Sequence, residues 1–287
     1  MPELPEVETI RRALAPVLVG ARLARVEARR PDLRFPLPEG FVQRLTGARI
    51  AGLDRRGKFL VAALDYGPKL LMHLGMSGRF EISAGAGARQ TGAFALAAPA
   101  DPKHAHVLFE TDGGVTVTYF DARRFGFMEI VAVNDTEGRS RLDGLGPEPL
   151  GELFDQDYLE AAFAGRRQNV KTLLLDQRLV AGLGNIYVCE ALHRACVSPL
   201  KPAADIAVPQ LGPLVDAIRS VLTEAILKGG STLRDYAQPD GELGYFQHAF
   251  KVYGRTGERC ERCTHCPGIL RIVQSGRSTF YCPATQR

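Results

Sequence analysis

The chain has 287 residues, enough for about two domains that each bury a core of their own. Hydrophobic residues make up 45% and charged residues 24%, which excludes a mostly disordered chain, and no apolar run approaches the ~18 residues of a membrane helix. The formal charge is only +4. Because the first residues, MPELPEVETIRR, lack the basic-then-apolar order of a signal peptide, a soluble, cytoplasmic protein is expected.

The chain begins with a predicted helix over residues 3–18, because apolar side chains recur there at spacings of three and four. Seven or so short runs rich in β-branched and aromatic residues follow, separated by Gly, Pro and Asp. They predict an all-β sandwich or barrel of roughly 115 residues. Residues 84–105, rich in Ala and Gly, are interpreted as a loop or a hairpin tip. The strand-like runs are ARLARVEAR, ARIAGLDRRGKFLVAAL, KLLMHLGM, GRFEIS, HVLFETDG, VTVTYFD and FGFMEIVAV.

The pattern becomes helical after residue 140, where LGPEPLG has the composition of a linker or turn. Residues 229–250 combine Gly, aromatic and polar residues without any period, which is typical of a functional or mobile loop. The predicted helices form a small helical domain and are DQDYLEAAFAG, NVKTLLLDQRLV, NIYVCEALHRAC and PQLGPLVDAIRSVLTEAILKG. Cys189 and Cys196, seven apart, are expected on one buried face of the third helix.

The last 37 residues, 251–287, hold seven Lys and Arg against two Glu, a density that favours a polyanionic partner over a merely solvated tail. Four of the six cysteines fall here, as Cys260-x2-Cys263-x2-Cys266-x15-Cys282. In a cytosolic chain this spacing favours a zinc knuckle over disulfides. Two strand-like runs flank a turn at 275–277. The segment has too little core to fold unaided, so one structural zinc is predicted.

The amino terminus carries a possible nucleophile. Removal of Met1 would leave a secondary amine on Pro2. The pKa of an α-amino group lies well below that of a lysine side chain, so more of it is unprotonated and nucleophilic near neutral pH. Its attack on a sugar carbon would give an iminium, which is an electron sink for elimination. Glu3 and Glu6 would share a face beside the amine, where one carboxyl is suited to acid–base catalysis. The alternative is that Pro and Glu simply cap a helix.

Other motifs are weak individually. Gly182-Leu-Gly-Asn185 opens a helix and suits either a phosphate oxygen or an ordinary turn and cap. The segment Asp121-Ala-Arg-Arg-Phe125, together with Met76, offers side chains that could enter a base stack, although each of them alone is more often a core or surface residue. No Ser/His/Asp triad or nucleotide P-loop pattern stands out.

Seven motifs occur in an order that resembles the bacterial formamidopyrimidine-DNA glycosylases, over residues 2–287. The resemblance implies an α+β multidomain protein, with a helix plus β-sandwich at 1–139, a helix–two-turns–helix domain at 140–250 and a zinc-finger hairpin at 251–287. A loop at about 229–248 would cap the lesion. The motifs are PELPEVETIRR, RRGKFL, HLGMSGR, DARRFG, LGPEPL, GLGNIY and SGRSTFYC.

The resemblance also implies a function. It predicts a base-excision repair enzyme that removes 8-oxoguanine and formamidopyrimidines from damaged double-stranded DNA and then cuts the strand by β,δ-elimination. The enzyme would be a cytoplasmic, nucleoid-associated monomer without a membrane partner. Pro2 would be the nucleophile and Glu3 the proton donor and acceptor, while Glu6 would position water or sugar. Lys58 would contact phosphate and assist base release.

The remaining roles concern DNA. The same resemblance implies that DNA phosphates are bound by His73, Asn185 and Arg277. Arg277 would also be a catalytic residue, and Lys171 would lie near the damaged base. The residues Met76, Arg123 and Phe125 would fill the gap left by the flipped nucleotide, with Arg124 beside them on the DNA.

One departure from the family concerns zinc. The family pattern is Cys-x2-Cys-x16-Cys-x2-Cys, and the position three residues after Cys282, where its last cysteine would stand, is Thr285. The simplest hypothesis is that Cys260, Cys263, Cys266 and Cys282 bind the zinc. The alternatives are His265 in place of one of them, or a metal-free finger.

Two rival functions remain. The related endonuclease VIII prefers oxidised pyrimidines, but the PELPEV start and the trio of gap-filling residues favour the purine branch. A zinc-containing protein that binds lesions without excising them would retain Met1 or bind without turnover.

Overall fold

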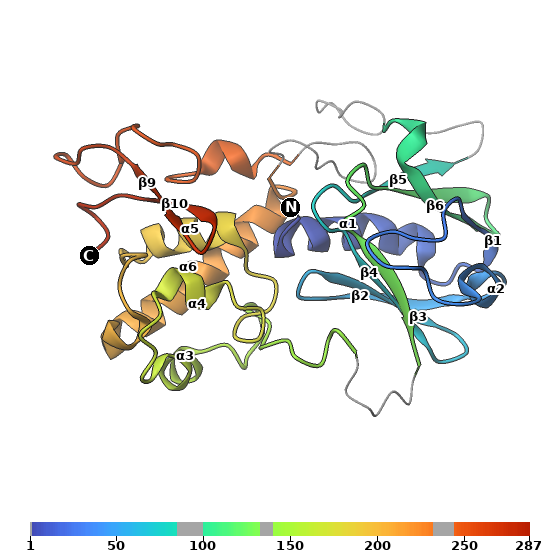
Figure 1. The fold of residues 1–287 in the computed structure, drawn as a ribbon, viewed down its shortest axis with the longest axis horizontal. Coiled ribbons are helices and arrows are strands. Elements are labelled where there is room, and N and C mark those ends of the chain that lie inside the picture. Colours follow the sequence, from blue (N-terminus) through green and yellow to red (C-terminus); the bar gives the residue numbers. More distant parts are fainter. Residues whose placement is uncertain (1, 85–99, 133–139, 232–243) are drawn as a thin grey trace. The chain divides into compact units, whose positions relative to one another are not determined.

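A computed structural model describes residues 2–84, 100–132, 140–231 and 244–287 (Figure 1). The chain divides into two compact units. The first contains Met1–Asp143 and Lys228–Gln247, and the second contains Gly144–Leu227 and His248–Arg287. Within the described part of the chain, no helix has the length and apolar character needed to cross a membrane.

Helix α1, Leu4–Leu18, confirms the first predicted helix. Its apolar positions Val7, Ile10 and Leu14 are fully buried in the core of the first unit, as the three- and four-residue spacing requires. Pro5 is accommodated in the first turn, where an amide has no intrahelical acceptor. The helix thus joins the chain's amino terminus to the core of the unit.

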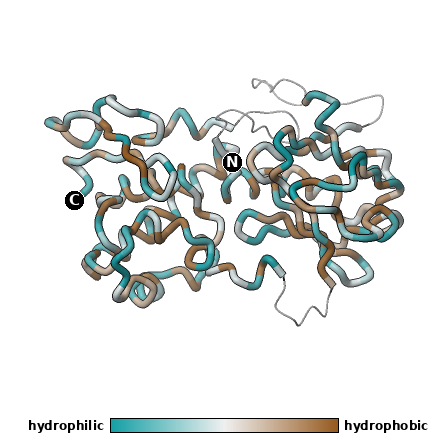
Figure 2. Tube along the Cα trace, in the orientation of Figure 1, coloured by the Kyte–Doolittle hydropathy of each residue, from teal (hydrophilic) through white to brown (hydrophobic). Residues whose placement is uncertain are grey.

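Two antiparallel four-stranded sheets form the rest of that core, in the orders β1-β6-β7-β5 and β2-β3-β4-β8. The helix α1 packs on β2 and β3. Hydrophobic positions, brown in Figure 2, gather along these strands, whereas the connecting turns are mostly hydrophilic. The elements are β1 (Leu23–Ala28), α2 (Phe41–Leu45), β2 (Ile50–Arg56), β3 (Phe59–Leu64), β4 (Lys69–His73), β5 (Arg79–Ala84), η1 (Pro102–His104), β6 (Ala105–Thr111), β7 (Val115–Phe120) and β8 (Phe127–Val131).

All the predicted strand runs are therefore found as strands, with the long run at 48–64 divided into β2 and β3 by a turn at Gly57, where φ is +56°. The short helix α2 was not predicted, because five residues show no usable period. Of the predicted loop at 84–105, residues 85–99 lie outside the described residues.

Glu8 links helix α1 to strand β2 through a partly buried ion-pair cluster. Its carboxylate accepts hydrogen bonds from Arg11 Nη2 at 2.8 Å and Arg12 Nε at 2.8 Å on the same helix, and from Arg55 Nε of β2 at 3.4 Å. Burial by itself would raise the pKa of the Glu8 carboxyl, but the hydrogen bonds from Arg11 and Arg12 and the charge of Arg55 outweigh it and lower the pKa from 4.5 to about 2.

We expect Glu8→Gln to lower the free energy of unfolding by about 2 kcal/mol at pH 7, because the isosteric amide cannot pair with three guanidinium groups. A carboxyl whose pKa falls on folding stabilises fully above its unfolded pKa, and that stability is lost as the pH drops through the folded pKa. The difference between wild type and variant should therefore shrink between pH 4.5 and about 2.

Urea denaturation at pH 7 and pH 3 measures this effect. The matched control is Glu27→Gln, since Glu27 pairs with Arg25 and Arg29 on the surface, where such pairs contribute about 0–1 kcal/mol. An equal loss at both pH values for Glu8→Gln would contradict the assignment.

The second unit contains the predicted helices and, at its carboxy-terminal end, an antiparallel hairpin. Helix α6 packs on α3 and α5, and α5 also contacts the hairpin strand β10. The predicted order of helix plus β-sandwich, helical segment and cysteine-bearing hairpin is confirmed. The elements are α3 (Gln156–Phe163), α4 (Val170–Leu174), α5 (Asn185–Arg194), η2 (Ala203–Asp205), α6 (Val208–Leu227), η3 (Phe246–Ala249), β9 (Leu270–Gln274) and β10 (Arg277–Tyr281).

Two local predictions were wrong. The run at 169–180 is helical only to Leu174, because backbone turns closed by Asp176 replace the helical pattern from there on. Cys189 is buried in α5 as expected, but the helix ends at Arg194. Cys196 therefore does not share its helical face and has a left-handed backbone with φ of +57°.

Candidate active site and nucleic-acid interface

The amino-terminal turn of α1 holds three of the predicted catalytic residues. Pro2 is buried, and Glu3 and Glu6 are only 3% and 2% exposed. Glu3 is the N-cap of α1, and its backbone N–H donates to Glu6 Oε2 at 2.8 Å, while the Glu3 side chain accepts from the Glu6 backbone. This reciprocal capping box explains the Glu-x-x-Glu spacing and orients the two carboxyls. The capping alternative is thus realised, and both carboxyls are buried in the turn that directly follows Pro2 in the chain.

Glu6 also holds a segment from far along the chain. Its Oε1 accepts from the backbone N–H of Ser231 at 2.8 Å and from the Ser231 hydroxyl at 3.1 Å. Gly230, with φ of +80°, lets the two segments approach, because a Cβ there would lie 3.0 Å from Glu6 Oε1. Residues 230–231 are therefore fixed against the first turn of α1. Of the loop predicted at about 229–248, residues 232–243 lie outside the described residues.

His73, at the end of β4, is a neutral hydrogen-bond donor. Burial first, and then the positive charges of Lys58, Arg34 and Arg141, lower its pKa from 6.5 to about 4. The backbone N–H of Gly75 donates to His73 Nδ1 at 3.1 Å, so the ring proton is carried by Nε2. A neutral Nε2–H with a defined direction suits a phosphate oxygen. Lys58, only 8% exposed, is close enough to act on this ring.

The three predicted gap-filling residues lie together on the first unit. Met76 and Phe125 are 37% and 42% exposed, unusual values for large apolar side chains, and the Arg123 guanidinium lies 4.8 Å from the Phe125 ring centre. These three residues line a groove of about 540 Å³ together with Leu33, Arg34, His73, Gly75 and Arg124.

Asp121 joins the two loops that carry these side chains. Its buried carboxylate accepts from the Ser77 hydroxyl at 2.6 Å and from the Gly126 N–H at 2.7 Å, and Ser77 in turn accepts from the Arg123 N–H at 3.1 Å. A Cβ on Gly75 would lie 2.2 Å from the Phe125 backbone, so glycine permits the close approach of the loops. The sequence motif contained Asp121, but nothing in the motif indicated that this residue links the two loops.

An aromatic and cationic cluster that the sequence did not predict contacts His73, one of the residues that line the groove. The Arg141 guanidinium lies 4.5 Å from the Phe35 ring centre and 4.6 Å from that of Phe127, and Phe127 stacks on His73 at 5.1 Å. These contacts join positions from distant segments, and no local pattern signals them. They pack the His73 ring against Phe127 and place the positive charge of Arg141 over the Phe35 and Phe127 rings.

The second unit carries three residues predicted to contact DNA, and their surroundings differ. Lys171 is fully buried, which is rare for a lysine without a functional or paired role. Asn185 begins α5 after Gly184, and its Nδ2 donates to the Ser278 carbonyl at 2.9 Å, so it braces the hairpin. Arg277 is the exposed first residue of β10, directly after the tight turn at Ser275 and Gly276.

The cysteine cluster lies at the base of that hairpin. The thiols of Cys260, Cys263 and Cys282 lie within 4.8 Å of one another, compared with the spacing of about 3.8 Å expected in a tetrahedral zinc–thiolate site. Cys266 is not one of these three grouped thiols, but it is close enough to Cys263 for that thiol to lower its pKa. Thr285 Oγ1 lies 3.6 Å from Cys260 Sγ. The donor set is consistent with a structural zinc.

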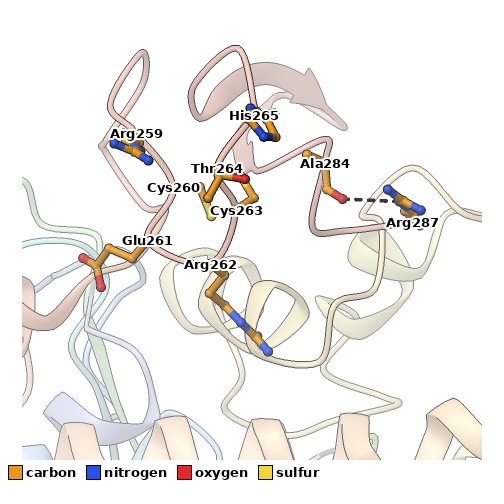
Figure 3. A pocket seen from close by; sticks show the side chains of 9 residues that line it. All are labelled: Arg259, Cys260, Glu261, Arg262, Cys263, Thr264, His265, Ala284 and Arg287. Atoms are coloured by element: carbon orange, nitrogen blue, oxygen red, sulfur yellow. Dashed lines mark hydrogen bonds between the residues drawn. The ribbon is translucent and has the colours of Figure 1, made fainter.

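Figure 3 shows the pocket beside this cluster, in which Cys260, Cys263 and His265 lie on one loop. The Arg262 side chain extends from the same loop toward helix α5. His265, the alternative ligand, lines the pocket, and among the described residues neither His265 nor Cys266 belongs to the group of three possible metal ligands.

The predicted residues therefore form two sets. The first unit carries Pro2, Glu3, Glu6, Lys58, His73, Met76, Arg123, Arg124 and Phe125. The second carries Lys171, Asn185, Arg277 and the cysteines.

Comparisons with known proteins cover the whole chain. A model described as the formamidopyrimidine-DNA glycosylase N-terminal domain matches residues 1–128, and one described as the H2TH domain of the same glycosylase matches 145–237. The chain is 62% identical to a formamidopyrimidine-DNA glycosylase of Caulobacter sp. (strain K31) over 287 residues, covering 100% of both chains.

Solved structures agree. The fold is similar to that of a mutant of Lactococcus lactis FPG in complex with DNA containing Fapy-dG, with a TM-score of 0.86 and 34% identity over 100% of both chains. It is also similar to Lactococcus lactis Fpg in complex with abasic-site DNA, with a TM-score of 0.85 and 34% identity over 99% of both chains.

Proposed function

The chain belongs to the formamidopyrimidine-DNA glycosylase family, and we infer that it removes formamidopyrimidine and 8-oxoguanine bases from duplex DNA and cleaves the strand at the resulting abasic site. This is a base-excision repair activity. The buried Glu3–Glu6 pair, directly after Pro2, is the observation that supports the catalytic assignment.

In the proposed reaction, the Pro2 amine forms a bond to the sugar C1′ and the damaged base leaves with a proton. Glu3 transfers protons at the sugar ring, for which a buried carboxyl next to the nucleophile is suited. The sugar ring then opens: the C1′–O4′ bond breaks, O4′ takes a proton from Glu3, and an iminium forms between Pro2 and C1′. This iminium accepts the electron pair when the C2′ proton is lost and the 3′ C–O bond breaks. The 5′ C–O bond breaks in the following δ-elimination. Glu6, whose oxygens already hold Glu3 and Ser231, acts as a positioning residue.

The base must leave the stack before this chemistry, which costs a few kcal/mol. We propose that Met76, Arg123 and Phe125 fill the space that the flipped nucleotide leaves in the duplex. Their exposed apolar and stacked cationic side chains would pack against the neighbouring bases and offset part of the cost of unstacking. The phosphate contacts are assigned to Lys58, His73, Arg124, Asn185 and Arg277, and Lys171 to the neighbourhood of the damaged base. Contacts of this kind fix the register of the DNA and make binding dependent on salt.

We propose that Cys260, Cys263, Cys266 and Cys282 hold one structural zinc, which would stabilise the base of the hairpin that carries Arg277. Thr285 occupies the family's fourth cysteine position and contacts Cys260 by its hydroxyl. We propose that the chain has three domains, at residues 1–139, 140–250 and 251–287. We also propose that the protein acts as a monomer on DNA at the nucleoid, in the cytoplasm.

Metal analysis tests the ligand set. We expect Cys266→Ser to lose most of its zinc on gel filtration in the presence of a chelator, since three thiolates leave the site with an open position. Cys196→Ser is the matched control, because Cys196 is half-buried in the same unit and lies outside the cluster. Full retention of zinc by Cys266→Ser, together with its loss in His265→Ala, would replace Cys266 by His265 in the ligand set.

The function is tested with a duplex that carries one 8-oxoguanine opposite cytosine, with and without borohydride. We expect strand cleavage and a covalent adduct that maps to Pro2. Faster excision of thymine glycol than of 8-oxoguanine would favour an endonuclease VIII activity. Tight lesion binding without cleavage, with Met1 absent by intact mass, would favour a binding-only protein.

A further inference from the structure

His193 lies in the last turn of α5 and contacts a proposed zinc ligand. The side chain is 2% exposed, and its Nε2 lies 3.3 Å from Cys260 Sγ, which is itself 1% exposed. The two residues are 67 positions apart in the sequence. No spacing in the zinc motif includes His193.

The direction of this hydrogen bond follows from the chemistry of the ligand. A metal-bound cysteine is a thiolate and carries no proton, so its sulfur can only accept. The imidazole Nε2–H must therefore donate to Cys260, and the Thr285 hydroxyl at 3.6 Å can donate to the same sulfur. Donors of this kind orient a metal ligand and spread its negative charge.

The helix α5 holds the finger at other points, so the His193 contact is part of a fixed frame. Glu190 accepts from the backbone N–H groups of Lys251, Val252 and Tyr253 at 2.8–3.0 Å. Beyond Cys260, Arg262 Nη1 donates to the carbonyls of His193 and Arg194 at 3.1 and 2.8 Å. The segments on both sides of Cys260 are thus attached to α5, by backbone N–H groups before it and by the Arg262 side chain after it, and between them the thiol lies 3.3 Å from the imidazole.

We propose that His193 is a positioning residue of the zinc site, whose Nε2–H donates to the Cys260 thiolate and couples metal binding to helix α5. The inference rests on the proposed ligand set in one respect, that Cys260 binds the metal.

The test compares two variants of the full-length protein. His193→Phe keeps a planar ring but removes the donor, and His193→Gln keeps an N–H at a similar reach. Zinc affinity is measured by competition with a chromogenic chelator. We expect His193→Phe to bind zinc about 10–100-fold more weakly, the usual effect of losing an outer-shell partner, and His193→Gln to recover most of that loss. Circular dichroism of the zinc-saturated variants confirms that both are folded.

Cobalt substitution distinguishes a donor from a ligand. At saturating cobalt, the ligand-field bands and the thiolate charge-transfer intensity should be the same in wild type and His193→Phe, because the ligand set is intact. Altered bands would identify His193 as a ligand and overturn the proposal. Equal weakening by Phe and Gln, or no weakening, would also overturn it.

The ligand set is tested in parallel with Cys260→Ser. If this variant keeps zinc as tightly as wild type, the proposed ligand set fails. If it loses zinc while His193→Phe binds normally, only the inference about His193 fails.

Discussion

Replacement of Pro2 by leucine is expected to abolish the borohydride-trapped adduct and to lower the rate of 8-oxoguanine excision by about a thousandfold or more, equivalent to about 4 kcal/mol of transition-state stabilisation. A bulky second residue blocks removal of Met1, so the free amine would be displaced by one residue from the buried Glu3–Glu6 pair. Nucleophilic catalysis requires the amine within bonding reach of the sugar carbon. Intact mass verifies that Met1 is retained.

Pro2→Ala is the matched control. Alanine is small enough for Met1 to be removed, and it leaves an α-amino group with an ordinary pKa near ~8, so trapping should persist. A trapped adduct in Pro2→Leu with Met1 retained would instead point to a lysine as nucleophile, with Lys58 the first candidate.

Glu3→Gln is expected to lower the excision rate about 10²–10⁴-fold, the usual contribution of a general acid or base, while leaving thermal stability nearly unchanged. The amide has the shape of the carboxyl and can still accept the hydrogen bond from the Glu6 backbone, so the helix cap survives. It cannot transfer a proton at the sugar. Single-turnover excision of 8-oxoguanine and thermal unfolding measure the two effects separately.

Glu6→Gln provides the contrast. The Glu6 carboxylate accepts from Glu3 and from two groups of Ser231, and an amide places an N–H among these donors. We expect this variant to lose stability by about 1–3 kcal/mol and to lose less rate than Glu3→Gln. If both variants lost the same fraction of the rate with unchanged stability, Glu3 would have no separate role in proton transfer.

The two remaining stability and metal predictions, for Glu8 and Cys266, concern the frame around this chemistry. Glu8 attaches the catalytic helix to β2, and the cysteine cluster supports the hairpin that presents Arg277. Damage to either is expected to affect folding or metal content before it affects chemistry.

Local pattern alone predicted the strands and the longer helices in their order, but not the five-residue helix α2. The spacing of Leu4, Val7, Ile10 and Leu14 predicted α1, and alternating or apolar runs predicted the strands. It overextended the helix after residue 169, because propensity does not show where turn hydrogen bonds replace helical ones. The ordered motifs likewise identified the family, since their residue types and spacing are contiguous in the chain.

By itself, then, the sequence determined the strands and the longer helices, the residue types available for chemistry at Pro2 and Glu3, and the presence of clustered cysteines suited to zinc. Only the tertiary structure showed that Glu6 holds Ser231, 225 positions away, that Asp121 ties two loops into one groove, and that His193 contacts Cys260. Local structure depends on side chains a few residues apart, which a linear pattern records. Hydrogen bonds between distant segments depend on how the sheets and helices pack, and a single sequence carries no periodic sign of that packing.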